Sequence, residues 1–241
     1  MKKGIILTLT GLVVASQAMT FADTIETTRY FDNEPLVISV LATDESGERN
    51  VYYEGDIIDL QEPTQWIDGK FMVPVKPVLD KMGYKVTWNA ETKSVDISKG
   101  AQFTTLYIGR NSYFKNKMAP KELSTAPTIL DGRTYVPIEF FSEMLGTGMA
   151  IEEREIKFTD SDMAIHSGYV QSVKTDEKGV TTIVISSKEK SEGIEDQIII
   201  HSEESYSILN TDVVEGAYIN VISPPIMTLS LPGQATGYVI Y

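Results

Sequence analysis

The chain has 241 residues, contains no cysteine, and carries 34 acidic against 21 basic residues, which gives a formal net charge of −13. A surface this acidic repels nucleic acid, because phosphate recognition needs clustered Lys and Arg. The lack of cysteine excludes disulfides, a lipoprotein anchor, thiolate metal sites and a cysteine nucleophile.

The first residues, Met1–Ala22, have the order of a secretory signal peptide. Two lysines precede an apolar run, Ile5–Ala15, and small residues follow. The run is shorter than the about 20 residues that a membrane-spanning helix needs, and no later segment approaches that length. We therefore predict cleavage after Ala22, with Ala18 as the alternative. The mature chain is expected to be secreted or associated with the cell envelope, without a transmembrane segment, and residues 23–34 form a lead-in.

One pattern then occurs twice, as DGKFMVPVKPVLDKMG and DGRTYVPIEFFSEMLG. Asp-Gly favours a tight turn, and the residues after it favour a strand. The proline of Val-Pro suits the first helical turn, and the closing glycine supplies a left-handed stop. The shared positions are Asp68, Gly69, Pro74 and Gly83 in the first copy, and Asp131, Gly132, Pro137 and Gly146 in the second.

A helix and a hairpin are predicted in each copy. Apolar residues after Val-Pro recur at helical spacing, at Val75, Val78, Leu79 and Met82, and again at Ile138, Phe140, Phe141, Met144 and Leu145. Pro77 is expected to delay or fray the first helix. After each glycine, alternating runs predict a β-hairpin, YKVTW with SVDIS and then MAI with IKF.

Each copy therefore predicts strands, a helix and a hairpin, which is an α+β unit. A unit this small buries little apolar surface alone, so the copies at 35–99 and 101–160 are expected to share one core. We predict one domain at 35–163 built from these two repeats. Val75, Leu79, Ile138 and Phe141 should be buried in it.

The duplicated pattern and its hairpins resemble the copper amine oxidase N-terminal domain family, also called the stalk-domain family, from Pro35 to Asp160. The resemblance implies a small α+β fold of the kind found on exported proteins of Gram-positive, often clostridial, bacteria. The family has Leu-Arg after Val-Pro, whereas this chain has Val75-Lys76 and Ile138-Glu139, so no role of that arginine carries over. The copper and quinone of amine oxidases belong to a separate catalytic domain, whose Asn-Tyr-acid motif and histidine ligands are missing from this sequence.

From residue 164 to 241 the pattern changes to strand-like runs divided by charged or Gly/Pro turns, which predicts a small all-β domain. The order of these runs is similar to the OB-like barrels appended to clostridial stalk-domain proteins. Ten acidic residues follow His166 against four lysines, so a polyanion is a poor candidate ligand.

The sequence predicts no catalytic residue, no metal site and no cofactor. His166 and His201 are the only histidines, and their spacing fits no metal motif. Exposed aromatic rings can stack on glycans, and Trp66, Tyr113 and Phe114 are the predicted exposed members, whereas Trp88 with Val86 is predicted in the core.

We therefore predict a non-catalytic scaffold or binding module at or near the bacterial cell envelope. One alternative is a protein that binds cell-wall glycan or peptidoglycan through the repeat aromatics. Another is an inhibitor or accessory subunit of a secreted enzyme, and a third is an enzyme whose site has no recognised motif. The expected partner is an envelope protein or a glycan, and the sequence leaves the oligomeric state open.

Overall fold

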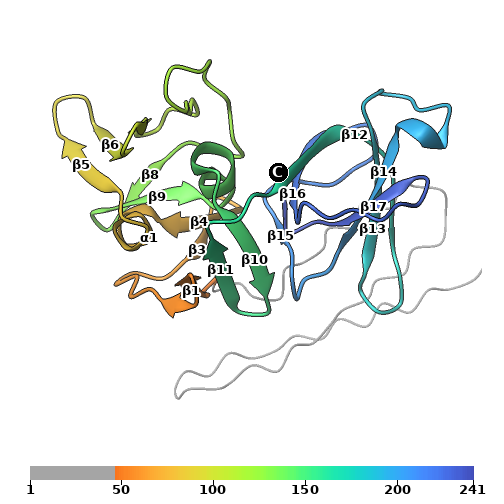
Figure 1. Cartoon of the computed structure of the whole chain (residues 1–241), viewed down its shortest axis with the longest axis horizontal. Coiled ribbons are helices and arrows are strands. Elements are labelled where there is room, and N and C mark those ends of the chain that lie inside the picture. Colours follow the sequence, from red (N-terminus) through yellow and green to blue (C-terminus); the bar gives the residue numbers. More distant parts are fainter. Residues whose placement is uncertain (1–46) are drawn as a thin grey trace, which may run out of the picture. The chain divides into compact units, whose positions relative to one another are not determined.

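In the computed structural model, residues 47–241 are described, and strands dominate them (Figure 1). The predicted signal peptide and lead-in lie outside the described residues. Within the described range the single α-helix is α1, Val75–Lys81, of seven residues. The predicted α+β class is therefore wrong, and the described residues form an all-β fold. The apolar stripes predicted helical segments at the correct positions. Each segment is short, however, so most of the regular structure consists of strands.

The centre of the repeat is a four-stranded antiparallel sheet in which the outer strands are those that precede the Asp-Gly turn of each copy. Its order is β3 (Gln65–Ile67), β4 (Lys70–Pro74), β9 (Arg133–Pro137) and β8 (Thr128–Leu130). Both Asp-Gly pairs have positive φ at both residues, 50° and 70° in the first copy and 49° and 76° in the second. Two positive φ values in succession define the tight hairpin turn that Asp-Gly favours, so the predicted turns are confirmed.

The two copies meet through β4 and β9. Three residue pairs face each other there: Met72 with Pro137, Val73 with Val136, and Pro74 with Tyr135. Alignment of the copies on their Asp-Gly and closing glycine makes Met72 equivalent to Tyr135, Val73 to Val136, and Pro74 to Pro137. Exchanging the copies therefore converts the first pair into the third and leaves the middle pair unchanged. The repeat therefore builds a local twofold axis through the Val73–Val136 pair.

A short helical segment follows the central strand in each copy. Helix α1 begins at Val75, so the prediction that Pro77 delays it is wrong. Pro77 is the third helical residue, and the N–H groups of the first turn have no intrahelical partner to lose. In the second copy Pro137 ends β9 rather than opening a helix, and a π-helical turn, η1 (Phe141–Leu145), follows. Gly146 ends it at φ 75°, as predicted.

Both predicted hairpins are confirmed. In the first copy, β5 (Lys85–Asn89) and β6 (Ser94–Lys99) pair and are joined by β7 (Gln102–Tyr107). In the second, β10 (Gly148–Glu152) and β11 (Glu155–Thr159) pair, and β1 (Asn50–Tyr53) joins in parallel, followed by β2 (Asp56–Ile57). Each hairpin thus acquires a third strand from elsewhere in the repeat.

The remaining residues form a seven-stranded sheet with one 3-10 turn, η2 (Ile194–Asp196). Its strands are β12 (Ala164–Thr175), β13 (Thr181–Ser186), β14 (Gln197–Ser202), β15 (Ile208–Leu209), β16 (Tyr218–Ser223), β17 (Gly233–Thr236) and β18 (Val239–Ile240). Strand β17 pairs in parallel with β14, whereas β18 pairs antiparallel with β16. The last segment therefore connects two strands on opposite sides of β12 and β13, and a separate apolar cluster fills the interior of this sheet.

The core of the repeat is shared, as the short units require. The four residues chosen as its markers, Val75, Leu79, Ile138 and Phe141, are all buried in one cluster. Ile208, Ile222, Val239 and Tyr241 of the C-terminal sheet belong to the same cluster. The boundary at residue 163 stays a prediction, because apolar contacts continue across it. Over residues 47–241, no helix is long and apolar enough to cross a membrane.

Candidate functional site

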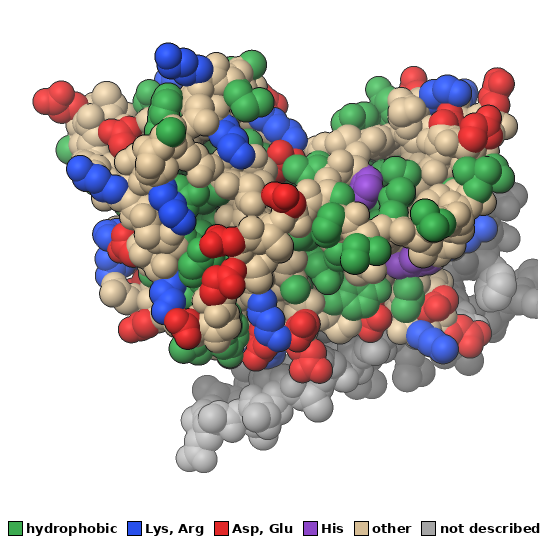
Figure 2. Space-filling model, in the orientation of Figure 1, with side chains coloured by type: hydrophobic (Ala, Val, Ile, Leu, Met, Phe, Trp, Pro, Cys, Tyr) green, Lys and Arg blue, Asp and Glu red, His purple; other side chains and the backbone are tan. Residues whose placement is uncertain are grey.

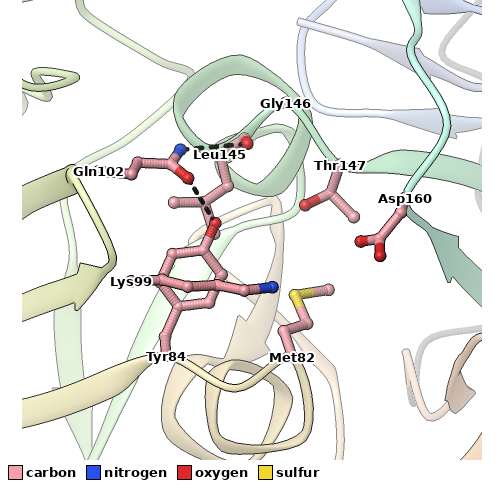
Figure 3. Close-up of a pocket in the computed structure, with 8 residues that line it drawn as sticks. All are labelled: Met82, Tyr84, Lys99, Gln102, Leu145, Gly146, Thr147 and Asp160. Carbon is pink, nitrogen blue, oxygen red and sulfur yellow. Dashed lines mark hydrogen bonds between the residues drawn. The ribbon is translucent and has the colours of Figure 1, made fainter.

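A pocket of about 370 Å³ lies where the two copies of the repeat come together (Figure 3). Equivalent positions of both copies line it, because Met82 and Tyr84 follow α1 while Leu145 and Thr147 end or follow η1. The pocket is therefore a product of the duplication.

The polar groups of this pocket are tied to one another. The Tyr84 hydroxyl donates to Gln102 Oε1 at 2.8 Å, and Gln102 Nε2 donates to the carbonyl oxygen of Leu145 at 3.1 Å (Figure 3). The same Nε2 also donates to the carbonyl oxygen of Met144 at 3.3 Å. These carbonyls end a helical turn and have no partner within it, so the amide caps them. The Lys99 ammonium lies 5.3 Å from the centre of the Tyr84 ring. Burial raises the pKa of Tyr84, so its hydroxyl keeps its proton.

Asp160 lies at the other side of the pocket and also has structural partners. It accepts a hydrogen bond from the Tyr53 hydroxyl at 2.7 Å, and its backbone N–H donates to Glu54 at 2.7 Å. The hydrogen bond to Asp160 raises the pKa of Tyr53 to about 12. Among the described residues of this pocket, no hydroxyl nucleophile is paired with a base. These hydrogen bonds join β1 to the end of β11.

The most unusual polar group is Glu139, which is fully buried. Its carboxylate accepts hydrogen bonds from the Ser124 N–H at 2.9 Å and from Asn210 Nδ2 at 2.8 Å. Burial raises its pKa above the ordinary value, although these hydrogen bonds oppose the shift. Sequence reasoning identified this position only as a departure from the Leu-Arg of the family. An acidic residue inside an apolar helical stripe was the available signal.

Asn210 connects this carboxylate to the central sheet. Its Oδ1 accepts from the Phe71 N–H at 2.7 Å, and its backbone carbonyl accepts from Lys70 Nζ at 2.6 Å. Nearby, Lys121 forms an ion pair of 2.5 Å with Glu143, which also accepts a hydrogen bond from Tyr241. Residues of the C-terminal sheet thus supply partners for buried polar groups of the repeat.

The predicted exposed aromatics do not form a row. Tyr113 is 0 % exposed, and its hydroxyl donates to the Thr125 carbonyl at 2.8 Å, so the prediction that it is exposed is wrong. Trp66 and Phe114 are half-buried, and each packs edge-on against a phenylalanine. Trp88, predicted to be core, is 47 % exposed. Val86 on the same strand packs on the repeat core, whereas Trp88 lies farther along the hairpin, beyond that cluster.

The two histidines do not share a site. The ring of His166 contacts the Ser223 hydroxyl at 3.0 Å, and that of His201 contacts Gln234 Oε1 at 3.0 Å. Burial lowers the pKa of His166. In the part of the chain that is described, no three His, Cys, Asp or Glu side chains gather as metal ligands.

An exposed loop without charge connects β16 to β17. Five of the seven residues from Pro225 to Leu231 are apolar, and all seven are exposed. No Asp, Glu, Lys or Arg occurs from Gly216 to Tyr241, in a chain with 34 acidic residues. Figure 2 shows hydrophobic side chains gathered over the surface that carries β16 and β17 in Figure 1. Sequence reasoning treated this stretch only as a turn.

The paired central strands, the shared core and the pocket between copies define a duplicated stalk-type domain whose polar groups hold structure. Residues 52–159 match the family model described as the copper amine oxidase N-terminal domain. Over this region the chain is similar to that family, and the resemblance seen in the repeat is confirmed.

The chain is also similar to a protein named protease inhibitor from Brevibacillus choshinensis. The two are 30% identical over 168 residues, which are 68% of this chain and 48% of the relative. The chain thus matches about half the length of that relative.

Proposed function

We propose that this protein is a non-catalytic binding protein that inhibits a peptidase outside the cell. The name of the Brevibacillus relative supports a protein target, and the order of residues in Met1–Ala22 supports export. Association with the cell envelope is part of the same proposal, since an exported inhibitor meets its target there. Among the three sequence-based alternatives, inhibition of a secreted enzyme has the strongest support. The aromatic platform for glycans has the least, because Tyr113 is buried.

The observation that carries this proposal is the loop Pro225–Leu231. Peptidases bind an extended segment of their target in a cleft, so an inhibitor must present such a segment beyond its own surface. Ile226 is 82 % exposed, Leu231 is 66 % exposed, and Leu229 between them is fully exposed. The free energy falls when a partner covers apolar side chains that are exposed to water at the tip of a loop.

Hydrogen bonds hold this loop in one conformation while Leu229 stays free. The Thr228 N–H donates to the Gln234 carbonyl, and the Gln234 N–H donates back to Thr228 Oγ1, both at 3.0 Å. On the other side of the tip, Ser230 Oγ donates to the Pro232 carbonyl at 2.7 Å. Both neighbours of Leu229 are therefore anchored to the base of the loop. A loop that is ordered before binding loses less conformational entropy when it docks.

The chemistry of the tip specifies the class of peptidase. Leu229 is aliphatic and uncharged, so it fits a specificity pocket that accepts large apolar side chains, as in chymotrypsin and subtilisin. Trypsin selects basic residues instead. We expect the protein to inhibit the first two enzymes and to leave trypsin active.

The test measures residual activity of chymotrypsin, subtilisin and trypsin with increasing amounts of the wild-type chain and of Leu229→Lys. The variant should bind chymotrypsin about 100-fold more weakly, which is the effect of a central interface residue, and should gain inhibition of trypsin. The matched control is Ile194→Lys, which places the same charge on an exposed aliphatic position of η2 and should change nothing.

Failure of the wild-type chain to inhibit any of the three enzymes would contradict the proposal. Rapid cleavage of the loop without inhibition would contradict it as well, because the loop would then be a substrate. Inhibition that survives in Leu229→Lys would place the contact on another surface.

A further inference from the structure

An open groove of about 500 Å³ lies between the start of α1 and the hairpin β5–β6 of the first copy and the turn of β8 and β9 of the second. We propose that this groove binds an extended segment of a partner protein, as the surface related to it by the local twofold binds residues 208–210 of this chain. This inference concerns the repeat and is independent of the loop between β16 and β17.

The surface related to this groove by the local twofold is formed by β4 of the first copy and by Glu139 of the second, and it is already occupied. Residues Ile208–Asn210 lie against β4, with Ile208 and Asn210 buried. Three groups of the repeat hold Asn210: the Phe71 N–H, the Lys70 ammonium and the Glu139 carboxylate. A short extended segment with an aliphatic side chain and a side-chain amide is therefore a ligand of this surface.

The local twofold relates each of these groups to a position in the lining of the open groove. Under the alignment of the two Asp-Gly pairs, Lys70 is equivalent to Arg133, Phe71 to Thr134, Glu139 to Lys76 and Glu143 to Asp80. All four counterparts line the open groove. The groove thus repeats the layout of the occupied site, with the same kind of cation at Arg133 and a reversed charge at Lys76.

The two surfaces differ in what covers them. Ile151 on β10 is 1 % exposed, whereas its equivalent on β5 is Trp88, which lines the open groove and is 47 % exposed. Ile129 on β8 also lines the groove and is 42 % exposed. The apolar position that is buried at Ile151 is therefore left in water at Trp88, and Ile129 adds a second exposed apolar side chain to the groove. Covering them is a source of binding free energy for a partner.

The charges of the groove select the chemistry of the occupant. In the occupied site Glu139 accepts a hydrogen bond from the amide of Asn210, but Lys76 can only donate. The partner must supply an acceptor at that position, and a carboxylate is the strongest one. Lys76 and Arg133 together outnumber Asp80 in the lining, in a chain whose net charge is −13. We therefore assign the occupant as an extended segment with two aliphatic residues followed by an aspartate.

The existing partners of these cations leave them available. Lys76 is paired with Asp80 in an ion pair whose two side chains are 62% and 48% exposed. Exposed ion pairs of this kind contribute little to stability, so exchanging Asp80 for a partner carboxylate costs little. Arg133 donates to Gln61 at 3.1 Å in an exposed hydrogen bond and has further donors for a main-chain carbonyl.

The test uses two synthetic peptides based on residues 206–211, YSILNT and its aspartate form YSILDT. Trp66→Phe leaves Trp88 as the single tryptophan of the chain, so its fluorescence reports directly on the groove. We expect YSILDT to shift the emission of Trp88 to shorter wavelength in a saturable way. YSILNT should bind several-fold more weakly. If Trp66→Phe does not fold, the indole N–H signal of Trp88 in the magnetic resonance spectrum of the wild-type chain gives the same information.

Two variants distinguish binding in this groove from nonspecific binding of the peptides. Lys76→Glu should weaken YSILDT at least 10-fold and leave YSILNT bound at least as well, because the charge now matches that of Glu139. Ile57→Lys, on the exposed strand β2 outside the groove, should leave both peptides unaffected. No saturable change at about 1 mM peptide, or equal binding of both peptides by the wild type and Lys76→Glu, would overturn the inference.

Discussion

The two copies of the repeat begin from the same pattern and end in different surroundings. In the second copy, the position after Val-Pro-Ile is Glu139, which is buried and held by Asn210. In the first copy, the equivalent Lys76 lies at the surface in an exposed ion pair. Duplication therefore reproduced the Asp-Gly turns and the strand register but not the environment of equivalent side chains. The C-terminal strands make the difference, because within the described residues Asn210 meets Glu139 but not the equivalent Lys76.

The helical segments show the same contrast. In the first copy α1 is a regular helix that ends at Lys81, whereas the second copy forms the π-helical turn η1. Glu143 of η1 meets Lys121 and Tyr241, and its equivalent Asp80 meets only a neighbour on its own helix among the interactions described. Glu143 thus has long-range partners that the equivalent Asp80 lacks among the interactions described.

The largest effect expected from this comparison is that of Asn210→Ala. The change leaves the Phe71 N–H and the Glu139 carboxylate buried without their partner, and losing one partner of a buried charged group is strongly destabilising. We expect the free energy of unfolding to fall by about 3 kcal/mol, measured by urea denaturation. Asn89→Ala, which removes a side chain that bonds only its own exposed turn, serves as the control and should cost less than about 1 kcal/mol. Equal losses in the two variants would mean that the buried network is not what distinguishes the copies.

A smaller effect is expected on the pH dependence of stability, through Glu139. Its pKa is raised by burial, so the folded chain holds this proton at pH values where the unfolded chain has released it. The stabilising contribution is complete below the unfolded pKa, near 4.3, and is lost as the pH rises through the raised folded pKa.

Glu139→Gln removes this titration. The wild type should therefore gain stability relative to the variant as the pH is lowered from 7 toward 5, by at most about 1.4 kcal/mol per pH unit. Urea midpoints measured for both proteins across this range test it. Parallel pH profiles would show that the carboxyl of Glu139 does not change its protonation between the two states, and a difference of opposite sign would contradict the raised pKa.

The smallest effect is expected at the equivalent position of the first copy. Lys76→Ala removes one exposed ion pair, so the free energy of unfolding should change by less than about 0.5 kcal/mol. The same urea measurement made with Asn210→Ala in parallel gives the contrast directly. A loss above 1 kcal/mol would show that Lys76 has a structural partner and would weaken its assignment to an open groove.

Local features were predictable because they depend on neighbouring residues. Asp-Gly dictated the two tight turns, Gly146 ended its helical turn, and alternating residues marked both hairpins. Helix length was not predictable in this way, because strand pairing on both sides of each apolar stripe decides where the helix begins and ends. The α+β class failed for that reason.

The candidate sites were less predictable than the fold, since exposure depends on what lies above a side chain. Tyr113 and Trp88 were assigned the wrong exposure, because neither the segment covering the first nor the open space beside the second can be inferred from a local pattern. Glu139 appeared only as a departure from a family motif. The loop Pro225–Leu231 appeared only as a turn, although its lack of charge was visible in the sequence.

By itself, the sequence determined that two equivalent units exist and that they need each other, because neither carries enough apolar surface for a core. The tertiary structure alone decided how they differ. The C-terminal sheet covers Glu139, so this carboxylate is removed from water and needs hydrogen-bond donors such as Asn210. The equivalent ammonium of Lys76 stays in water. Hydrogen bonding and desolvation act between residues far apart in the chain, and this is why equivalent positions in a repeat can differ so widely in environment.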